Sequence, residues 1–206
     1  MVNEIFEELF SRYPALEVCR EDIKNAYETL KDCYDNGGKL LCCGNGGSSA
    51  DSDHLVGELM KGFLKQRPLS DEEKAKFRNE NVASGLQKGL PAISLTAQTA
   101  LMTAFLNDCD TALIYAQQVY GFAKKNDVLI GFSTSGNSKN VVYALDAARA
   151  AGIKSITVTG SRESKCSEQS DICIRLPETE TFKIQELTLP VYHCLAAMIE
   201  ATYFDK

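Results

Sequence analysis

The sequence predicts an α/β fold: a three-layer α/β/α sandwich around a five-stranded parallel sheet, preceded by two helices. Short, nearly continuous apolar runs alternate with stretches of helical periodicity along the chain. Strands of a parallel sheet have this pattern because crossover helices bury both of their faces. With 206 residues, 44% of them hydrophobic and 24% charged, the chain has the size and composition of one globular domain, 1–206.

The first 36 residues predict the two leading helices. Apolar residues recur at helical spacing over 3–16 and again over 18–35. The run Asn36-Gly37-Gly38 then indicates a stop, because glycine commonly follows the last residue of a helix.

Five strands and their connecting helices follow. The first strand, 39–43, enters the glycine-rich run GNGGSS, and a helix starts at about Ser48. Strands at 91–96 and 127–133 are each followed by a helical stretch. Two more strands and a long final helix are expected at 154–160, 171–177 and 181–203.

Residues 61–89 interrupt this alternation. They are polar and charged, and they separate the first helix of the sheet from the second strand. We expect an exposed insertion with a short helix begun by Ser70-Asp71, with Glu72-Glu73 in its first turn. A solvated loop is the simpler interpretation. A lid or an interface arm is the alternative, because the insertion follows closely on the glycine-rich run.

Charge and cysteine usage narrow the class of protein. A formal net charge of −6 argues against holding nucleic acid through overall charge, which needs a basic face. The eight cysteines form no C-x-x-C motif, and several lie in apolar runs, which favours small buried side chains in a reducing compartment. The acidic amino terminus lacks the features of a signal peptide, and no apolar stretch approaches the ~18 residues of a membrane span. We therefore expect a cytoplasmic protein with neither a nucleic-acid nor a membrane partner.

Two loops predict an anion-binding site. GNGGSS at 44–49 and STSGNS at 133–138 each end a strand and open a helix. Ligands of open α/β sheets bind beyond the carboxyl ends of the strands, where helix amino termini offer free N–H groups. The first loop matches neither the dinucleotide-binding nor the P-loop pattern. In the second loop, four hydroxyls around one glycine can hold a phosphate without a basic patch, whereas capping the helix would require only one.

The two histidines of the chain, His54 and His193, fall at suggestive positions. His54 and Glu58 are four residues apart on one predicted helix, and Gln185 and His193 are eight apart on another, so each pair shares a helix face. A lone helical histidine is more often a packed or solvent-facing residue. Two imidazoles with two oxygen ligands nevertheless form a divalent-metal set, with zinc favoured.

An ordered set of motifs carries a resemblance to a known family. CGNGGSSADSDHLVGEL, LNDCD, GFSTSGNSKNVVYAL, ITVTG and IQELTLPVYH closely resemble the SIS (sugar isomerase) domain family, and within it the phosphoheptose isomerases. The resemblance implies a flavodoxin-like fold that converts sedoheptulose 7-phosphate into D-glycero-D-manno-heptose 7-phosphate, a precursor of surface glycans or lipopolysaccharide, through an enediol. It also implies bound zinc and a homotetramer with shared active sites, for which the leading helices are suitable interface elements.

The same resemblance implies roles for single residues. Glu58 matches the proton-abstracting base and His193 its partner acid or base. The phosphate would be held by Ser133, Thr134, Ser135 and Ser138. Further substrate contacts would come from Asn45, Gly46, Gly47, Ser48, Glu58, Asn107, Asp108 and Gln185. The metal ligands match His54, Glu58, Gln185 and His193.

The sequence departs from the family pattern in two places, and one alternative function stays open. Phe182-Lys183 stands before Ile184-Gln185 where many members have Asp-Arg, a change that bears on recognition of the sugar hydroxyls. The segment 61–89 also looks longer than usual. The alternative is a noncatalytic SIS module, either a sugar-phosphate sensor or a tetrameric scaffold for a replication-initiation protein. Such modules can lose the metal residues, and because this chain has all four, the isomerase is favoured.

Overall fold

The computed structural model describes residues 1–205 and contains a five-stranded, all-parallel sheet in the order β2-β1-β3-β4-β5. The strands are β1 (Leu40–Gly44), β2 (Ala92–Ser94), β3 (Val128–Phe132), β4 (Lys154–Thr159) and β5 (Ile172–Arg175). This is the strand order of flavodoxin-like doubly wound sheets, so the predicted fold class is confirmed. Its switch point lies between β1 and β3, the two strands that the loops at 44–49 and 133–138 follow.

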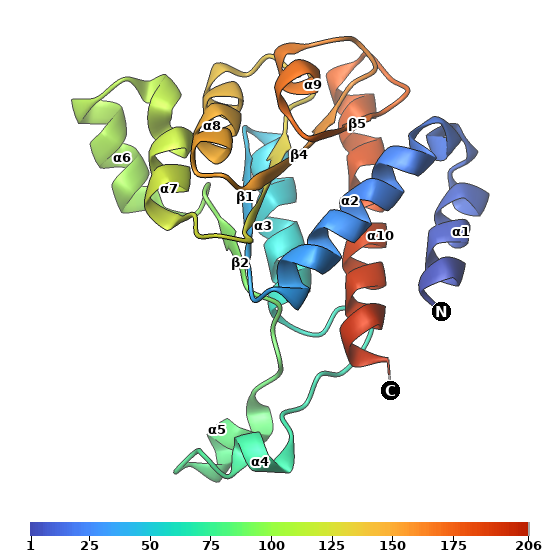
Figure 1. Ribbon diagram of the computed structural model, residues 1–206, viewed down its shortest axis with the longest axis vertical. Helices are drawn as coiled ribbons and strands as arrows, with labels where there is room; N and C mark the ends of the chain where they lie inside the picture. Colours follow the sequence, from blue (N-terminus) through green and yellow to red (C-terminus); the bar gives the residue numbers. More distant parts are fainter. Residues whose placement is uncertain (206) are drawn as a thin grey trace.

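Helices cover both faces of the sheet. Successive side chains of a strand point to opposite faces: Leu40 and Cys42 belong to one core cluster, whereas Leu41 and Cys43 belong to the other. The first face carries α1 (Val2–Arg12), α2 (Arg20–Asp35), α3 (Gly47–Met60) and α10 (Thr181–Phe204) (Figure 1). The second face carries α7 (Ile114–Phe122), α8 (Lys139–Ala150) and α9 (Lys165–Gln169), with α6 (Thr99–Asp108) outside α7 (Figure 1).

The leading helices differ from their predicted bounds. Instead of continuing to residue 16, α1 ends at Arg12, and a 3-10 helix, η1 (Pro14–Cys19), precedes α2. The cause is Pro14, because a residue before proline avoids the helical region. Tyr13 accordingly has φ −130° and ψ 71°.

The helical stretch after β2 is broken in the middle. Between α6 and α7 lies a second 3-10 helix, η2 (Thr111–Leu113), which begins where the Asp110 side chain accepts a hydrogen bond from the Ala112 N–H (2.9 Å). The LNDCD motif therefore spans the end of α6 and this break. Within residues 1–205, no helix combines the length and the hydropathy that crossing a bilayer requires.

Residues 61–89, called the arm below, extend away from the sheet (Figure 1). The arm contains α4 (Asp71–Lys74), which Ser70 and Glu73 cap reciprocally as the sequence predicts. It also contains an unpredicted helix, α5 (Glu80–Gly85), capped by Asn79. The prediction of an exposed insertion is wrong for Arg67, which is 1% exposed. Its charge has a buried partner on α10, which a local pattern does not reveal.

Candidate active site

The loop after β1 packs directly against the start of α10. Gly46 has φ +57° and ψ −122°, a backbone conformation that residues other than glycine rarely adopt. At Gly47 an added Cβ would lie 2.5 Å from Nε2 of Gln185, so glycine is required for this close approach. The main chain therefore turns sharply at these two glycines, and Gln185 lies against the first turn of α3.

A pair of asparagines joins the two loops. The side-chain amides of Asn45 and Asn140 bond each other reciprocally, at 2.9 and 2.8 Å. Tyr115 supports this loop by donating its hydroxyl proton to the Gly44 carbonyl (2.5 Å). Asn140 was not among the predicted site residues, although it lies within the GFSTSGNSKN motif. Its role depends on a partner 95 residues away.

Ser138, the N-cap residue of α8, does not use its hydroxyl to cap the helix. Its Oγ instead accepts a hydrogen bond from Ser133 Oγ (3.0 Å). Gly136 has φ +64°, and a Cβ there would lie 2.0 Å from Ser164 Oγ, so the turn is tight. This arrangement favours the ligand interpretation over simple helix capping.

A pocket of about 210 Å³ lies between this loop and the first turn of α10. Its polar lining consists of Thr134, Ser135, Asn137, Ser161, Arg162, Glu163, Glu178, Thr179 and Thr181. Arg162 was not predicted; it supplies an exposed positive charge beside the hydroxyls. The pocket thus combines hydroxyl donors, one guanidinium and a helix amino terminus, which suit a phosphate, with the carboxylates of Glu163 and Glu178, which do not.

The unusual Phe182-Lys183 pair lies at the rim of this region. Its neighbours on either side, Thr181 and Ile184, line the pocket. The Phe182 side chain is largely exposed, and Lys183 forms an ion pair with Glu180 (3.0 Å). Nothing in the structure explains what the replacement of Asp-Arg changes in sugar recognition.

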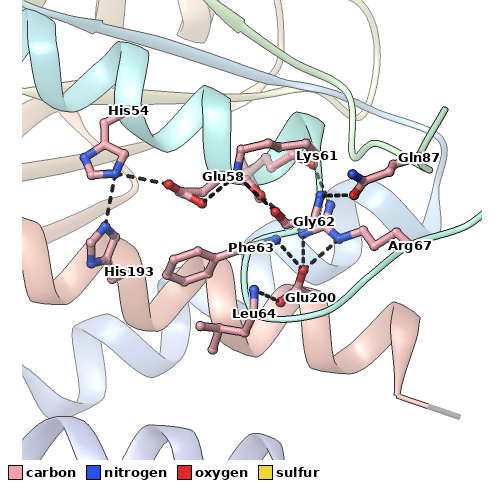
Figure 2. Close-up of polar contacts among 11 residues, drawn as sticks. His54, Glu58, Lys61, Gly62, Phe63, Leu64, Arg67, Gln87, His193 and Glu200 are labelled. Carbon is pink, nitrogen blue, oxygen red and sulfur yellow. Dashed lines mark hydrogen bonds and ion pairs between the residues drawn. The ribbon is translucent and has the colours of Figure 1, made fainter. Parts of the chain in front are cut away.

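A cluster of imidazole and carboxylate groups lies between α3 and α10 (Figure 2). His54 Nε2 is 3.1 Å from Glu58 Oε1 and 3.4 Å from His193 Nε2. The second carboxylate oxygen, Glu58 Oε2, is buried without a hydrogen-bond partner among the described residues, and Lys61 Nζ lies 3.5 Å from it. The only two histidines thus meet, as their placement on helices suggested.

The neighbours of His54 orient its ring. Tyr192 OH lies 2.9 Å from His54 Nδ1 and 3.3 Å from Asp51 Oδ1. Burial raises the pKa of Tyr192, so its hydroxyl is protonated at neutral pH. Asp51 accepts a hydrogen bond from the Tyr192 hydroxyl, and the same hydroxyl contacts the Nδ1 side of the His54 ring. These contacts orient the imidazole so that Nε2 faces Glu58 and His193.

The surroundings of His193 favour the neutral form of its imidazole. Burial, together with the nearby His54, lowers its pKa below the ordinary histidine value. A neutral imidazole can accept a proton or bind a metal, whereas a protonated one can do neither.

The donor set fits zinc in its chemistry. Nitrogen and oxygen ligands of tetrahedral zinc lie roughly 3.3–3.6 Å apart, close to the two distances from His54 Nε2. Glu58 Oε2, which makes no hydrogen bond among the described residues and pairs only with Lys61 Nζ at 3.5 Å, is a further buried ligand atom. However, no three His, Cys, Asp or Glu side chains within residues 1–205 converge on one point as a ready-made metal site. The structure thus supplies suitable ligands without showing a complete coordination shell.

The remaining predicted site residues are placed differently. Gln185 lies against Gly47, about 12 Å along α10 from His193. Asn107 and Asp108 end α6, are exposed, and bond each other (2.8 Å). Because α6 lies outside α7, on the other face of the sheet from α3 and α10, the chain does not bring them to the cluster (Figure 1).

The fold and these loops define a class: a doubly wound α/β protein whose two loops follow the carboxyl ends of β1 and β3, where ligands of such sheets bind. Two SIS domain models match the sequence, one over residues 83–199 and the other over residues 7–88. The chain belongs to the SIS domain family.

Relatives along the whole chain are phosphoheptose isomerases. The one from Nitratiruptor sp. is 35% identical over 202 residues, which cover 98% of this chain and 91% of that protein. The one from Rhodospirillum rubrum is 39% identical over 182 residues, which cover 88% and 86% of the two chains. The structure of the phosphoheptose isomerase from Neisseria gonorrhoeae matches with a TM-score of 0.76, 30% identity and 97% of each chain covered. The family resemblance of the motifs is thereby confirmed.

Proposed function

We propose that this protein is an aldose-ketose isomerase that converts sedoheptulose 7-phosphate into D-glycero-D-manno-heptose 7-phosphate. The observation that carries the proposal is the His54–Glu58–His193 cluster, which stands beside α10 about two turns beyond the phosphate-type pocket. A seven-carbon sugar phosphate has its reacting carbons and its phosphate at opposite ends. Relatives named phosphoheptose isomerase support the same substrate.

The phosphate end is held by neutral donors. Ser133, Thr134, Ser135 and Ser138 offer hydroxyls, and the first turn of α8 offers main-chain N–H groups, which together bind a dianion. Arg162 at the pocket adds a charge-assisted hydrogen bond. This explains how a chain with a net charge of −6 accommodates an anionic substrate.

The reacting end is served by Glu58 and His193. Glu58 takes a proton from C1 of the ketose, the C1–H electron pair forms the C1=C2 bond, and the C2 oxygen gains a proton. Glu58 then returns its proton to C2 while the C1 hydroxyl loses its own, which leaves an aldehyde at C1. His193, neutral because its pKa is lowered, carries the proton between the two oxygens.

Zinc is part of the proposal, held by His54, Glu58 and His193, whereas Gln185, the fourth ligand that the family resemblance implies, lies against Gly47 outside the cluster. When bound, it would supply Lewis-acid polarisation of the substrate carbonyl. A carboxylate oxygen bound to a cation is a poor base, and the two oxygens of Glu58 differ in their surroundings. Oε1 contacts His54, whereas Oε2 makes no hydrogen bond among the described residues and has only Lys61 Nζ as an ion-pair partner at 3.5 Å, so we assign proton abstraction to Oε2.

The assembly and its location belong to the same proposal. A homotetramer is supported by α6, which contributes no buried residue and exposes Leu101 and Leu106. The leading helix α1 instead buries Phe6, Leu9 and Phe10 within its own chain, so α6 is the better interface element. All eight cysteines are free, which supports a cytoplasmic location.

A turnover assay tests the proposal. Purified protein is incubated with sedoheptulose 7-phosphate and with shorter ketose phosphates, with and without a chelator, and the aldose formed is quantified. We expect turnover of the seven-carbon substrate and a loss of rate with chelator. Tight binding without turnover of any ketose phosphate would instead support the noncatalytic sensor.

A further inference from the structure

A fully buried ion pair lies beyond the cluster, between the arm and α10. The side chains of Arg67 and Glu200 are 0% and 1% exposed, and their closest N–O distance is 2.8 Å. Burying two charges costs free energy that their mutual attraction seldom recovers, and an apolar pair of similar size is often at least as stable. Fold stability alone therefore does not account for this pair.

Glu200 organises the beginning of the arm. Its Oε1 accepts hydrogen bonds from Arg67 Nε and the Phe63 N–H, both at 2.8 Å, and its Oε2 accepts one from the Leu64 N–H at 2.7 Å (Figure 2). This bond holds the main chain of Phe63, whose ring packs against the imidazole of His193 with ring centroids 5.2 Å apart. Glu200 thus acts on His193 through Phe63.

Arg67 organises the end of α3. Its Nη1 donates to the Leu59 carbonyl (2.7 Å) and its Nη2 to the Glu58 carbonyl (3.2 Å). The last carbonyls of a helix lack partners within the helix, and a cation there also complements the helix dipole. At the other side of the guanidinium, the Phe204 ring lies 4.6 Å away. Arg67 therefore holds the helical turn that carries Glu58.

From these contacts we infer that Arg67 and Glu200 are positioning residues of the active site. One end of the pair fixes the main chain of Glu58, and the other holds the main chain of Phe63, whose ring packs against His193. The two groups that exchange protons with substrate stand on different helices, and the pair ties both to one rigid unit. This inference rests on the proposed isomerase, because the roles of Glu58 and His193 come from it.

The test uses the double variant Arg67→Met/Glu200→Leu in the full-length, untagged protein. Removing one partner alone would leave an unpaired buried charge, whereas removing both leaves no such charge and takes away only the hydrogen bonds to the main chain of Glu58, Leu59, Phe63 and Leu64. We expect a folded protein whose kcat for sedoheptulose 7-phosphate falls about 10- to 100-fold, because small displacements of reacting groups have effects of that size. KM should change by less than about threefold, since the phosphate pocket does not contain these residues.

A matched control comes from another largely buried pair. Lys39 and Asp127 join the starts of β1 and β3, and Asp127 also accepts hydrogen bonds from the N–H groups of Lys39 (2.9 Å) and Lys124 (2.7 Å). The variant Lys39→Met/Asp127→Leu should alter stability but leave kcat per folded chain unchanged. A similar fall of kcat in both double variants would show that the effect is general and would overturn the inference.

A second readout separates this inference from the proposed function. Because the chain has only two histidines, the imidazole NMR spectrum of the protein as purified reports on His54 and His193 alone. We expect these signals to shift in Arg67→Met/Glu200→Leu and to stay in place in the control. If the wild type has no isomerase activity, the proposed function fails while the spectrum still tests the positioning.

The single variant Arg67→Lys provides a second test in case the double variant does not fold. Arg67→Lys keeps the charge beside Glu200, but a single ammonium cannot replace the guanidinium fork that reaches two carbonyls. We expect reduced kcat and shifted imidazole signals in the folded protein. Unchanged kcat together with unmoved imidazole signals in a folded variant would show a purely structural pair and overturn the inference.

Discussion

The Nε2 atoms of His54 and His193 lie 3.4 Å apart although 139 residues separate them in the chain. The parallel course of α3 and α10 produces this meeting, because Gly47 and Gln185 are in contact near the starts of the two helices. From Gly47 to His54 and from Gln185 to His193 the helices advance by nearly equal lengths. The position of Glu58 one turn further along α3 then completes a site that can be tested by substitution.

Substitution of the proposed proton-transfer groups should abolish activity without unfolding the protein. Glu58→Gln removes the base, and His193→Ala removes the shuttle, each lowering kcat by about 10²- to 10⁴-fold. Steady-state kinetics and thermal unfolding measure the two effects. Glu72→Gln, at an exposed carboxylate of the arm, is the control. Full activity in both site variants would refute the catalytic assignment.

Loss of the loop hydroxyls should weaken substrate binding more than chemistry. Thr134→Ala and Ser135→Ala each remove a hydroxyl that lines the pocket and so a hydrogen bond of about 1.5–3 kcal/mol to a charged phosphate, and KM should rise about 10- to 100-fold. The effect on kcat should be smaller because these residues are remote from the cluster. Ser84→Ala on the exposed side of α5 serves as the control. An unchanged KM would mean that the phosphate binds elsewhere.

Two glycines of α3 should respond in opposite ways to alanine. At Gly47 the new methyl group would lie 2.5 Å from the Gln185 amide, so Gly47→Ala must displace Gln185 or the loop and reduce kcat/KM. At Gly57 nothing lies within 4 Å of an added Cβ, and Gly57→Ala should stabilise the helix by up to about 1 kcal/mol without loss of activity. Kinetics and denaturant unfolding of both variants distinguish these effects. Equal kinetics would show that the Gly47–Gln185 contact is not required.

Activity should depend on bound zinc, and zinc binding should depend on His54. We expect zinc to copurify with the protein, and His54→Ala to lower both the zinc content and the rate. Metal analysis of dialysed samples, with and without chelator, measures the content. Binding to the native state alone should also raise the unfolding temperature when zinc is added back. A metal-free protein with full activity would exclude a required metal.

The thiols should fall into two classes of reactivity. Burial raises the pKa values of Cys19, Cys33, Cys166 and Cys194 to about 12, so these thiols remain protonated at pH 8. Cys109 is exposed and Cys173 is half-buried, so a thiol reagent should modify these two in the native protein. The buried cysteines should react only upon unfolding, as a count of modified thiols before and after adding denaturant would show. Rapid modification of more than two thiols in the native protein would contradict this pattern.

Local patterns of the sequence determine much of this protein. The five strands, the two ligand loops and the i, i+4 pair His54–Glu58 follow from apolar runs, glycine turns and helical spacing, all of which act between residues close in the chain. The break at Pro14 is equally local. Its effect on Tyr13 could have been derived from the sequence, so the predicted helix to residue 16 missed an available signal.

Only the tertiary structure decided which distant groups meet. The strand order, the Asn45–Asn140 pair and the separation of Asn107 and Asp108 from the cluster depend on how helices pack on the sheet. In the sequence, Arg67 belongs to a charged segment that favours solvent, yet it is buried because Glu200, 133 residues later, accepts its hydrogen bond. A single sequence records the spacing along each helix but not the contacts between helices, and packing around the common core supplies those contacts.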